Sequence, residues 1–287
     1  MKKERSNYPI KMMAQLLGVS RSGFYAWLRR SPSARKCHDE QMKPLVRAVH
    51  EFSRKTYGPR RMQSELLENG VILGRDHIAR LRKEMGLKCI QHKKFIATTN
   101  SNHDLPVAKN LLEQDFSVME PGTVYGTDIT YISTDEGWLY LAGVKDFGSR
   151  EIIGHAMGER MTKELVHEAF RKAIQYRKPK LGCIHHSDRG SQYCALSYQK
   201  AVKDAGLVAS MSRRGNCYDN APTESFWGFL KQELVYQRRF TTRAEAKAAI
   251  QEYIEVFYNR IRRHSILGNI APARYAELWF SRLKKTA

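Results

Sequence analysis

The sequence is poor in cysteine and has no long apolar run, and each shortage excludes a class of protein. Five cysteines are spread over 287 residues without a CxxC pair, which argues against both a disulfide framework and a zinc ribbon. The sequence has no apolar run long enough to span a membrane, and the charged start MKKERSNYP lacks the apolar segment of a signal peptide. We therefore expect a cytoplasmic protein with reduced cysteines and no membrane contact.

Acidic residues are also scarce relative to basic ones. The chain has 49 Lys and Arg against 29 Asp and Glu, a net charge of +20. Residues 1–110 contain 23 Lys and Arg against 9 Asp and Glu, so the excess lies mainly in the N-terminal part. A solvated basic surface is one interpretation, but this asymmetry favours contact with nucleic-acid phosphates.

Three carboxylates stand in distinctive local sequences. Asp128 lies in GTDITYI, Asp188 in HHSDRGSQY and Glu224 in NAPTESFWGFLKQEL. Asp188 and Glu224 are separated by 35 residues, and Lys231 follows Glu224 by seven, which puts both on one side of a helix. Mg²⁺ and Mn²⁺ prefer hard oxygen ligands, and two such ions about 3.5–4 Å apart suit attack on a phosphodiester. The pattern predicts a metal site.

This pattern resembles the retroviral-integrase-like DDE transposases of bacterial insertion sequences. The strings TDITYI, HSDRGSQY, SMSRRGNCYDNAPTESFWGFLKQE and YNRIRRHSILG are similar to one group, whose transposase is assembled from two overlapping reading frames by programmed frameshifting. The chain resembles the downstream-frame (OrfB-type) product, and the similarity runs from the region of Ser20 to about Tyr275. Tyr125 and Gly126 depart modestly from the family pattern, in which an aromatic and a larger apolar residue are usual.

The resemblance implies both a fold and a reaction. The fold is a ribonuclease H-like α/β core, a mixed five-stranded sheet with flanking helices, preceded by small all-α helix-turn-helix modules. Asp128, Asp188 and Glu224 are the implied catalytic residues and the ligands of two divalent ions, Mg²⁺ or Mn²⁺. The implied activity is cleavage of element ends followed by strand transfer of the 3′-OH. The implied partners are DNA, the upstream-frame product and further copies of this chain on DNA.

Helix-capping residues, glycines and prolines predict that the chain is divided into four parts. Residues 1–35 form a helix-turn-helix module in which Ser20 begins the second helix and Phe24, Trp27 and Leu28 form its buried face. Residues 36–97 form a second helical module with helices near 38–54, 59–69 and 75–85. Residues 98–117 form an exposed connector and hinge, and residues 118–287 form the catalytic domain.

Within the catalytic domain, apolar segments predict three hairpin-linked strands, then alternating helices and strands, with Glu224 in the first turn of a helix. Residues 241–267 are expected to form one long amphipathic helix. Basic residues of the two helical modules and of the catalytic domain are candidates for DNA contact, with ordinary surface charge as the alternative. The candidates are Arg21, Arg75, Arg80, Arg82, Arg189, Lys231, Arg262 and Arg263.

Other residues could compete for the metal. Asp146 is the main rival, and we expect it to cap a turn at a strand end. Asp135 and Glu136 are expected to be solvated in a hairpin, and Asp219 to serve as a helix cap. His185 and His186 lack partners at metal-ligand spacing, so we expect them either to support the metal ligands without binding the metal or to have a structural role.

Two functions from other classes remain open. A ribonuclease H-type nuclease or junction resolvase uses the same acids but is not expected to carry two N-terminal helical modules. A DNA-binding regulator accounts for the basic helices and leaves the three carboxylates unexplained. Joining of 3′-OH ends distinguishes a transposase from both.

Overall fold

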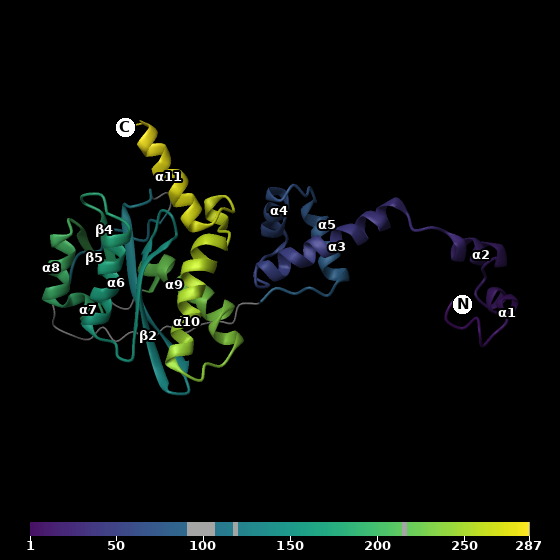
Figure 1. Ribbon diagram of the computed structural model, residues 1–287, viewed down its shortest axis with the longest axis horizontal. Coiled ribbons are helices and arrows are strands. Elements are labelled where there is room, and N and C mark those ends of the chain that lie inside the picture. The colour runs from purple at the N-terminus through teal and green to yellow at the C-terminus, as the bar shows by residue number, and fades with distance from the viewer. Residues whose placement is uncertain (91–106, 117–119, 214–216, 287) are drawn as a thin grey trace.

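The computed structural model describes residues 1–90, 107–116, 120–213 and 217–286. Two small helical modules precede an α/β domain built on a mixed five-stranded sheet (Figure 1). The predicted fold class is therefore confirmed. Residues 98–106 and 117 of the predicted connector, and with them most of the expected hinge, lie outside the described residues.

The first module is a pair of short helices, α1 (Ile10–Leu16) and α2 (Arg21–Arg29). Ser20 begins α2 because its hydroxyl accepts a hydrogen bond from the amide of Gly23 (3.0 Å). Phe24 is buried, but Trp27 is 54% exposed, so the prediction that Trp27 belongs to the buried face is wrong. A unit of two short helices is too small to cover this ring.

Three helices make the second module, close to the predicted bounds. They are α3 (Ala34–Phe52), α4 (Pro59–Glu68) and α5 (Arg75–Glu84). Pro59 suits the start of α4 because its ring fixes a helical φ, and Gly70 and Gly86 follow α4 and α5 with left-handed φ of 77° and 67°. The apolar faces enclose a core of Val46, Val49, Tyr57, Met62, Leu66, Leu73, Ile78 and Leu81.

The sheet of the α/β domain has the strand order β3-β2-β1-β4-β5. The strands are β1 (Val124–Thr134), β2 (Gly137–Asp146), β3 (Ile152–Gly158), β4 (Ile184–Ser187) and β5 (Val208–Met211). β1 pairs antiparallel with β2 and parallel with β4. The first and fourth strands are thus neighbours, as the family resemblance implies.

Helices cover both faces of the sheet (Figure 1). One face carries α6 (Lys163–Tyr176), α7 (Ser191–Cys194) and α8 (Leu196–Asp204), and the other carries α9 (Ala221–Glu233) and α10 (Arg243–Glu252). Side chains of β2 alternate between the two layers, with Ala142 and Val144 in one core and Leu139 and Leu141 in the other. Short 3₁₀ turns, η1 (Cys217–Asn220) and η2 (Val235–Gln237), flank α9.

The prediction of one long helix over residues 241–267 is correct only in part, because the helical run extends without a break from Arg243 to Ile261, changes to a π-helix on the way and ends there. A π-helical segment η3 (Tyr253–Ile261) follows α10, and the chain then makes a 3₁₀ turn η4 (Ser265–Leu267). The wider turn of a π-helix changes which side chains face inward, and Tyr253, Phe257 and Tyr258 are all fully buried here. The last helix is α11 (Pro272–Thr286).

The second helical module contacts this C-terminal region. The hydroxyl of Tyr57 donates to the carbonyl of Ile261 (3.0 Å) and accepts from the amide of Arg263 (2.8 Å). The guanidinium carbon of Arg54 lies 4.3 Å from the ring centroid of Phe257. The module is therefore attached to the α/β domain through specific polar and cation–π contacts.

Residues 107–116 also attach to the α/β domain. The amide of Leu111 donates to the hydroxyl of Ser210 (2.9 Å), and Leu112 is buried in a cluster with Val124 and Phe147. This part of the expected connector therefore packs on the domain that it precedes.

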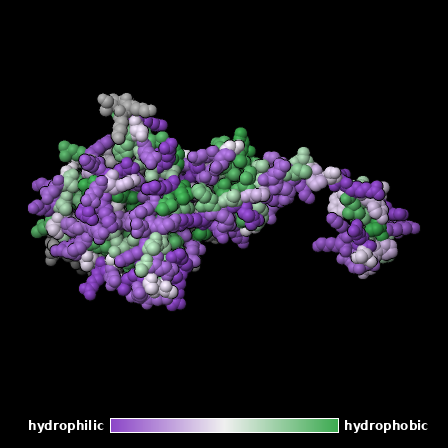
Figure 2. All heavy atoms as spheres, viewed as in Figure 1, coloured by the Kyte–Doolittle hydropathy of each residue, from purple (hydrophilic) through white to green (hydrophobic). Residues whose placement is uncertain are grey.

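In the described ranges, no helix combines the length and apolar character needed to cross a membrane. Figure 2 shows hydrophilic side chains over much of the visible face, with apolar residues between them.

Candidate active site

Asp128 and Asp188 are brought together by the register of two parallel strands. β1 and β4 pair Val124 with Ile184 and Gly126 with His186. The same offset continued by two residues places Asp188, just past the end of β4, beside Asp128 within β1. Two aspartates that are far apart in the sequence thus meet on one side of the sheet.

Glu224 joins them from the first turn of α9. Two hydrogen bonds hold the start of this helix against the sheet: Asn220 Nδ2 donates to the carbonyl of Thr127 (3.2 Å), and Lys145 Nζ donates to the carbonyl of Pro222 (2.7 Å). Both bonds join residues close to Glu224 to β1 or β2. The predicted three acids therefore face one another from three separate elements.

The electrostatics of these acids agree with their proximity. Burial, the charge of Asp188 and, to a smaller extent, that of Glu224 raise the pKa of Asp128 well above its ordinary value. Burial and the charge of Asp188 also raise the pKa of Glu224. Repulsion among carboxylates is what a bound cation would relieve, so the cluster fits hard divalent ions.

Both oxygens of Asp128 accept hydrogen bonds from the protein. Oδ1 accepts from its neighbouring amide at Ile129 (2.8 Å), and Oδ2 accepts from the indole nitrogen of Trp227 (3.0 Å). Both donors are neutral. By contrast, Asp219 and Glu233 are hydrogen-bonded to arginines. The carboxylate of Asp128 is therefore oriented by two neutral donors.

Lys231 lies at the same site. It is buried, its Nζ lies 4.9 Å from the ring centroid of Tyr131, and the charge of Asp128 acts on it. Burial lowers the pKa of Lys231, while Asp128 raises it. Lys231 is therefore close enough to Asp128 for their charges to interact.

Tight packing around residue 126 explains why a glycine stands there, and the sequence alone does not reveal this packing. A Cβ added at this position would lie 2.2 Å from the ring of Phe147 and 2.7 Å from the hydroxyl of Thr223. The helix that carries Glu224 approaches β1 this closely only because residue 126 has no side chain. The departure from the family pattern thus accommodates the local packing.

The loop after β4 orients Asp188. The amide of Gly190 donates to Asp188 Oδ1 (2.8 Å), and Arg189 Nε donates to the carbonyl of Ser212 (2.7 Å). Arg189 therefore ties this loop to the end of β5, close to the carboxylates.

His185 and His186 have the structural role that was expected. His185 Nε2 lies 2.8 Å from the hydroxyl of Tyr198, and His186 is hydrogen-bonded to Ser210 and Ser212. Burial lowers the pKa of His185 to about 3 and that of His186 to about 4. Both rings are therefore uncharged at neutral pH, and both are buried in the core.

Asp146, the main rival ligand, is a turn residue as predicted. It accepts hydrogen bonds from the amides of Gly122 and Gly148 and from the hydroxyl of Ser149. Burial raises its pKa to about 6. These three donors satisfy the carboxylate within the turn.

The other rival acids also have protein partners. The prediction that Asp219 caps α9 is wrong, because Asp219 is fully buried and accepts from Arg213 and Gln114. In the β1–β2 hairpin, Asp135 pairs with Arg239 (2.8 Å), and the exposed Glu136 accepts from the amide of Arg243.

The candidates for DNA contact fall into different environments. Arg21 and Arg75 are exposed, and Arg75 is hydrogen-bonded to Asp76. Arg82 is buried and donates to Cys89 Sγ (2.8 Å). Arg262 is 2% exposed and binds Glu233 through two nitrogens, so the structure gives it an internal partner in place of DNA.

Arg263 also has internal partners. Its Nε donates to Glu65 Oε2 (2.6 Å), and its side chain also pairs with Glu68. The sequence shows a basic cluster at this point, but the acids that neutralise it come from the second helical module, almost 200 positions earlier. Arg263 serves the contact between the two parts of the chain.

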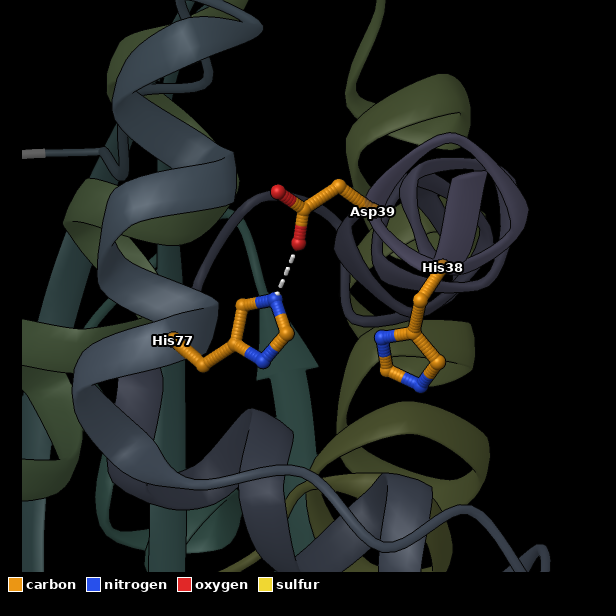
Figure 3. A group of neighbouring side chains, drawn as sticks. All are labelled: His38, Asp39 and His77. Carbon is orange, nitrogen blue, oxygen red and sulfur yellow. Dashed lines mark hydrogen bonds and ion pairs between the residues drawn. The ribbon is translucent and has the colours of Figure 1, made fainter. Parts of the chain in front are cut away.

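A second group of ligand-type side chains lies between α3 and α5. His77 Nε2 is 2.6 Å from Asp39 Oδ1, with His38 beside them (Figure 3). Arg80 Nη2 donates to the same Asp39 oxygen (2.8 Å), and it holds the pKa of Asp39 well below its usual range. A guanidinium bound to that oxygen would repel a divalent cation. We therefore interpret the group as a set of polar contacts that joins α3 to α5 and that includes Arg80.

The sheet order, the two aspartates on neighbouring parallel strands and the glutamate on the covering helix define a ribonuclease H-like polynucleotidyl transferase of the DDE type. Family models agree with this class. Residues 119–217 and 224–278 match models described as an integrase core domain, and residues 37–95 match an HTH-like domain.

Curated relatives specify the family. The chain is 58% identical over 265 residues to the "Insertion element IS600 uncharacterized 31 kDa protein" of Shigella sonnei, covering 92% of this chain and 97% of that protein. It is 40% identical to "Transposase InsF for insertion sequence IS3A" of Escherichia coli (strain K12), covering 95% and 96%. The chain belongs to the IS3-type transposases of bacterial insertion sequences.

Among solved structures, a chain of the simian T-cell lymphotropic virus intasome in complex with PP2A regulatory subunit B56 gamma is 15% identical. The likeness covers 80% of this chain and 73% of that chain, with a TM-score of 0.47.

Proposed function

We propose that this chain cleaves the ends of an insertion element and transfers the resulting 3′-OH to a second phosphodiester. The observation that carries the proposal is the convergence of Asp128, Asp188 and Glu224, which comes from the register of β1 and β4 and from the anchored start of α9. Membership of the transposase family supports the same reaction.

Two divalent ions, Mg²⁺ or Mn²⁺, fit the three carboxylates. Asp128, Asp188 and Glu224 would hold them, because burial and, after it, the mutual repulsion of the acids raise the pKa of Asp128 and Glu224, and a bound cation would relieve that repulsion. Bound there, such ions supply activation of the attacking oxygen and stabilisation of the leaving 3′ oxygen.

The two steps share one chemistry. In cleavage, a water oxygen attacks phosphorus, the bond from phosphorus to the 3′ oxygen breaks, and that oxygen leaves as a 3′-OH. In transfer, the 3′-OH attacks another phosphorus, and the new strand junction forms as a second 3′ oxygen leaves. No covalent bond to the protein forms, so the carboxylates would act by holding the metal ions and not as nucleophiles.

Basic side chains near the site are suited to hold the DNA. Lys231 lies beside Asp128, and Arg189 borders Asp188. Arg21 and Arg75, which are exposed on the helical modules, would contact the backbone farther from the site. Arg80 and Arg82 would support DNA binding indirectly, by stabilising the second module, since both side chains are hydrogen-bonded to other residues of that module.

Two further elements of the proposal concern partners. The chain would act together with the upstream-frame product, as a fusion or a complex, and as an oligomer on DNA that holds two element ends. Both rest on family membership, and the reaction is expected to require paired ends.

A strand-transfer assay separates the proposed function from its rivals. The full chain, fused to the upstream-frame product, is incubated with labelled element ends and target DNA in Mg²⁺ or Mn²⁺. Joined products are expected. Cleavage without joining would favour a nuclease, and DNA binding without either product would favour a regulator.

A further inference from the structure

Trp227 links two of the three catalytic elements. It lies on α9 three residues after Glu224, and its indole nitrogen donates to Asp128 Oδ2 on β1 (3.0 Å). The hydrogen bond therefore ties the helix that carries one acid to the carboxylate of another. The sequence gives no sign of this contact, because the two residues are separated by 99 positions.

The indole is fixed in place by its surroundings. Trp227 is only 4% exposed, and its ring contacts that of Phe226 with a centroid distance of 4.9 Å. On β2, a Cβ added at Gly143 would lie 2.8 Å from the Trp227 ring. Gly143 is the register partner of Asp128, so the ring crosses the β1–β2 pair where the carboxylate stands.

The hydrogen bond acts on one charge state of Asp128. An indole N–H is a donor only, so it favours the ionised carboxylate over the protonated acid. Burial and the neighbouring acids act in the opposite direction. Since Ile129 binds Oδ1 and Trp227 binds Oδ2, the two donors also fix the rotation of the carboxylate.

We propose that Trp227 is a positioning residue that holds the Asp128 carboxylate in one orientation, ready to receive a divalent cation. The inference rests on the proposed metal site and assigns part of its preorganisation to a neutral donor. Each Asp128 oxygen retains a further lone pair for a cation, because a carboxylate oxygen can accept more than one bond.

Removal of the N–H alone tests this role. Trp227→Phe deletes the donor and retains an aromatic ring, and incorporation of β-(3-benzothienyl)alanine at position 227 retains the bicyclic shape without the donor. Mn²⁺ affinity is measured by calorimetry on the full chain without DNA. Both substitutions are expected to weaken Mn²⁺ binding about tenfold, the size of one hydrogen bond to a charged group.

Stabilisation of the full chain by Mn²⁺ supplies a second readout. This readout is the rise in melting temperature that added Mn²⁺ produces, which is expected to be smaller without the donor, since weaker binding stabilises the folded chain less. Trp279→Phe is the matched control, because the indole nitrogen of Trp279 is buried without a hydrogen-bond partner in the described chain. This control should leave both readouts unchanged.

The outcomes separate the inference from the proposed metal site. Unchanged Mn²⁺ affinity in the benzothienyl protein, with an unaltered melting temperature in the absence of Mn²⁺, would overturn the positioning role. Asp128→Asn tests the metal site itself: Mn²⁺ binding as tight as in the wild type would overturn the site and the inference with it.

Discussion

The hydroxyl of Tyr57 accepts a hydrogen bond from the amide of Arg263 (2.8 Å), a residue 206 positions later in the chain. The same hydroxyl donates to the carbonyl of Ile261 (3.0 Å). Tyr57 is fully buried, and it belongs to the core of the second helical module. One side chain thus serves the core of the module and its attachment to the α/β domain.

Tyr57→Phe should therefore lower stability without creating a cavity. The substitution leaves the carbonyl of Ile261 and the amide of Arg263 without their partner, at a cost of about 2 kcal/mol in the free energy of unfolding. Urea denaturation measures this loss. Tyr8→Phe, at a tyrosine that is 53% exposed, is the control. Equal unfolding midpoints for Tyr57→Phe and the wild type would contradict the attachment.

Gly126→Ala should destabilise the active-site region. The new methyl would overlap the ring of Phe147 and the hydroxyl of Thr223, and overpacking of this kind costs about 1–3 kcal/mol. Gly228→Ala, within α9, is the matched control, since a Cβ there meets nothing within 4 Å.

Helix propensity predicts that Gly228→Ala is neutral or stabilising by up to about 1 kcal/mol. The two variants should therefore shift the urea midpoint in different directions. A stabilising effect of Gly126→Ala would show that α9 does not approach β1 closely at this point.

The buried histidines predict a loss of stability in mild acid. Unfolded histidine takes up a proton as the pH falls below 6.5, whereas the folded-state pKa of His185 is lowered to about 3. The unfolded state therefore binds more protons than the folded state between these values, and the free energy of unfolding falls as the pH falls. For His185 the loss between pH 7.5 and pH 5 is about 2 kcal/mol.

Urea denaturation at pH 7.5 and pH 5 measures this dependence. His185→Gln removes the titrating ring and keeps a polar group near Tyr198, so the difference between the two pH values should shrink by about 2 kcal/mol relative to the wild type. An unchanged difference would mean that His185 is readily protonated in the folded chain.

Local sequence and family resemblance predict much of the fold. Ser20, Pro59 and the apolar strand segments give the element bounds closely, because caps, fixed φ values and alternation act within a few residues. The predictions that fail concern packing. Trp27 is exposed because its module is small, and the helical run predicted to reach residue 267 changes to a π-helix at Tyr253 and ends at Ile261.

The three acids of the candidate site could be predicted from the sequence, but the residues that hold them in place could not. Asp128, Asp188 and Glu224 stand in long motifs that the family resemblance interprets. The contact of Trp227 with Asp128 and the ion pairs of Arg263 depend on which distant segments meet. No local pattern encodes such contacts, which is why Arg262 and Arg263 appear in the sequence as surface charge.

The central claim is that one cluster of three carboxylates carries out the chemistry. The most direct test is strand transfer by the wild-type chain and by Asp128→Asn, Asp188→Asn and Glu224→Gln, all fused to the upstream-frame product, with binding to element ends measured in parallel. Asp135→Asn, in the exposed β1–β2 hairpin, is the control. Each site variant should bind DNA and lose joined product by at least about a hundredfold, while the control retains activity. Joined product at the wild-type level from any one of the three would contradict the claim.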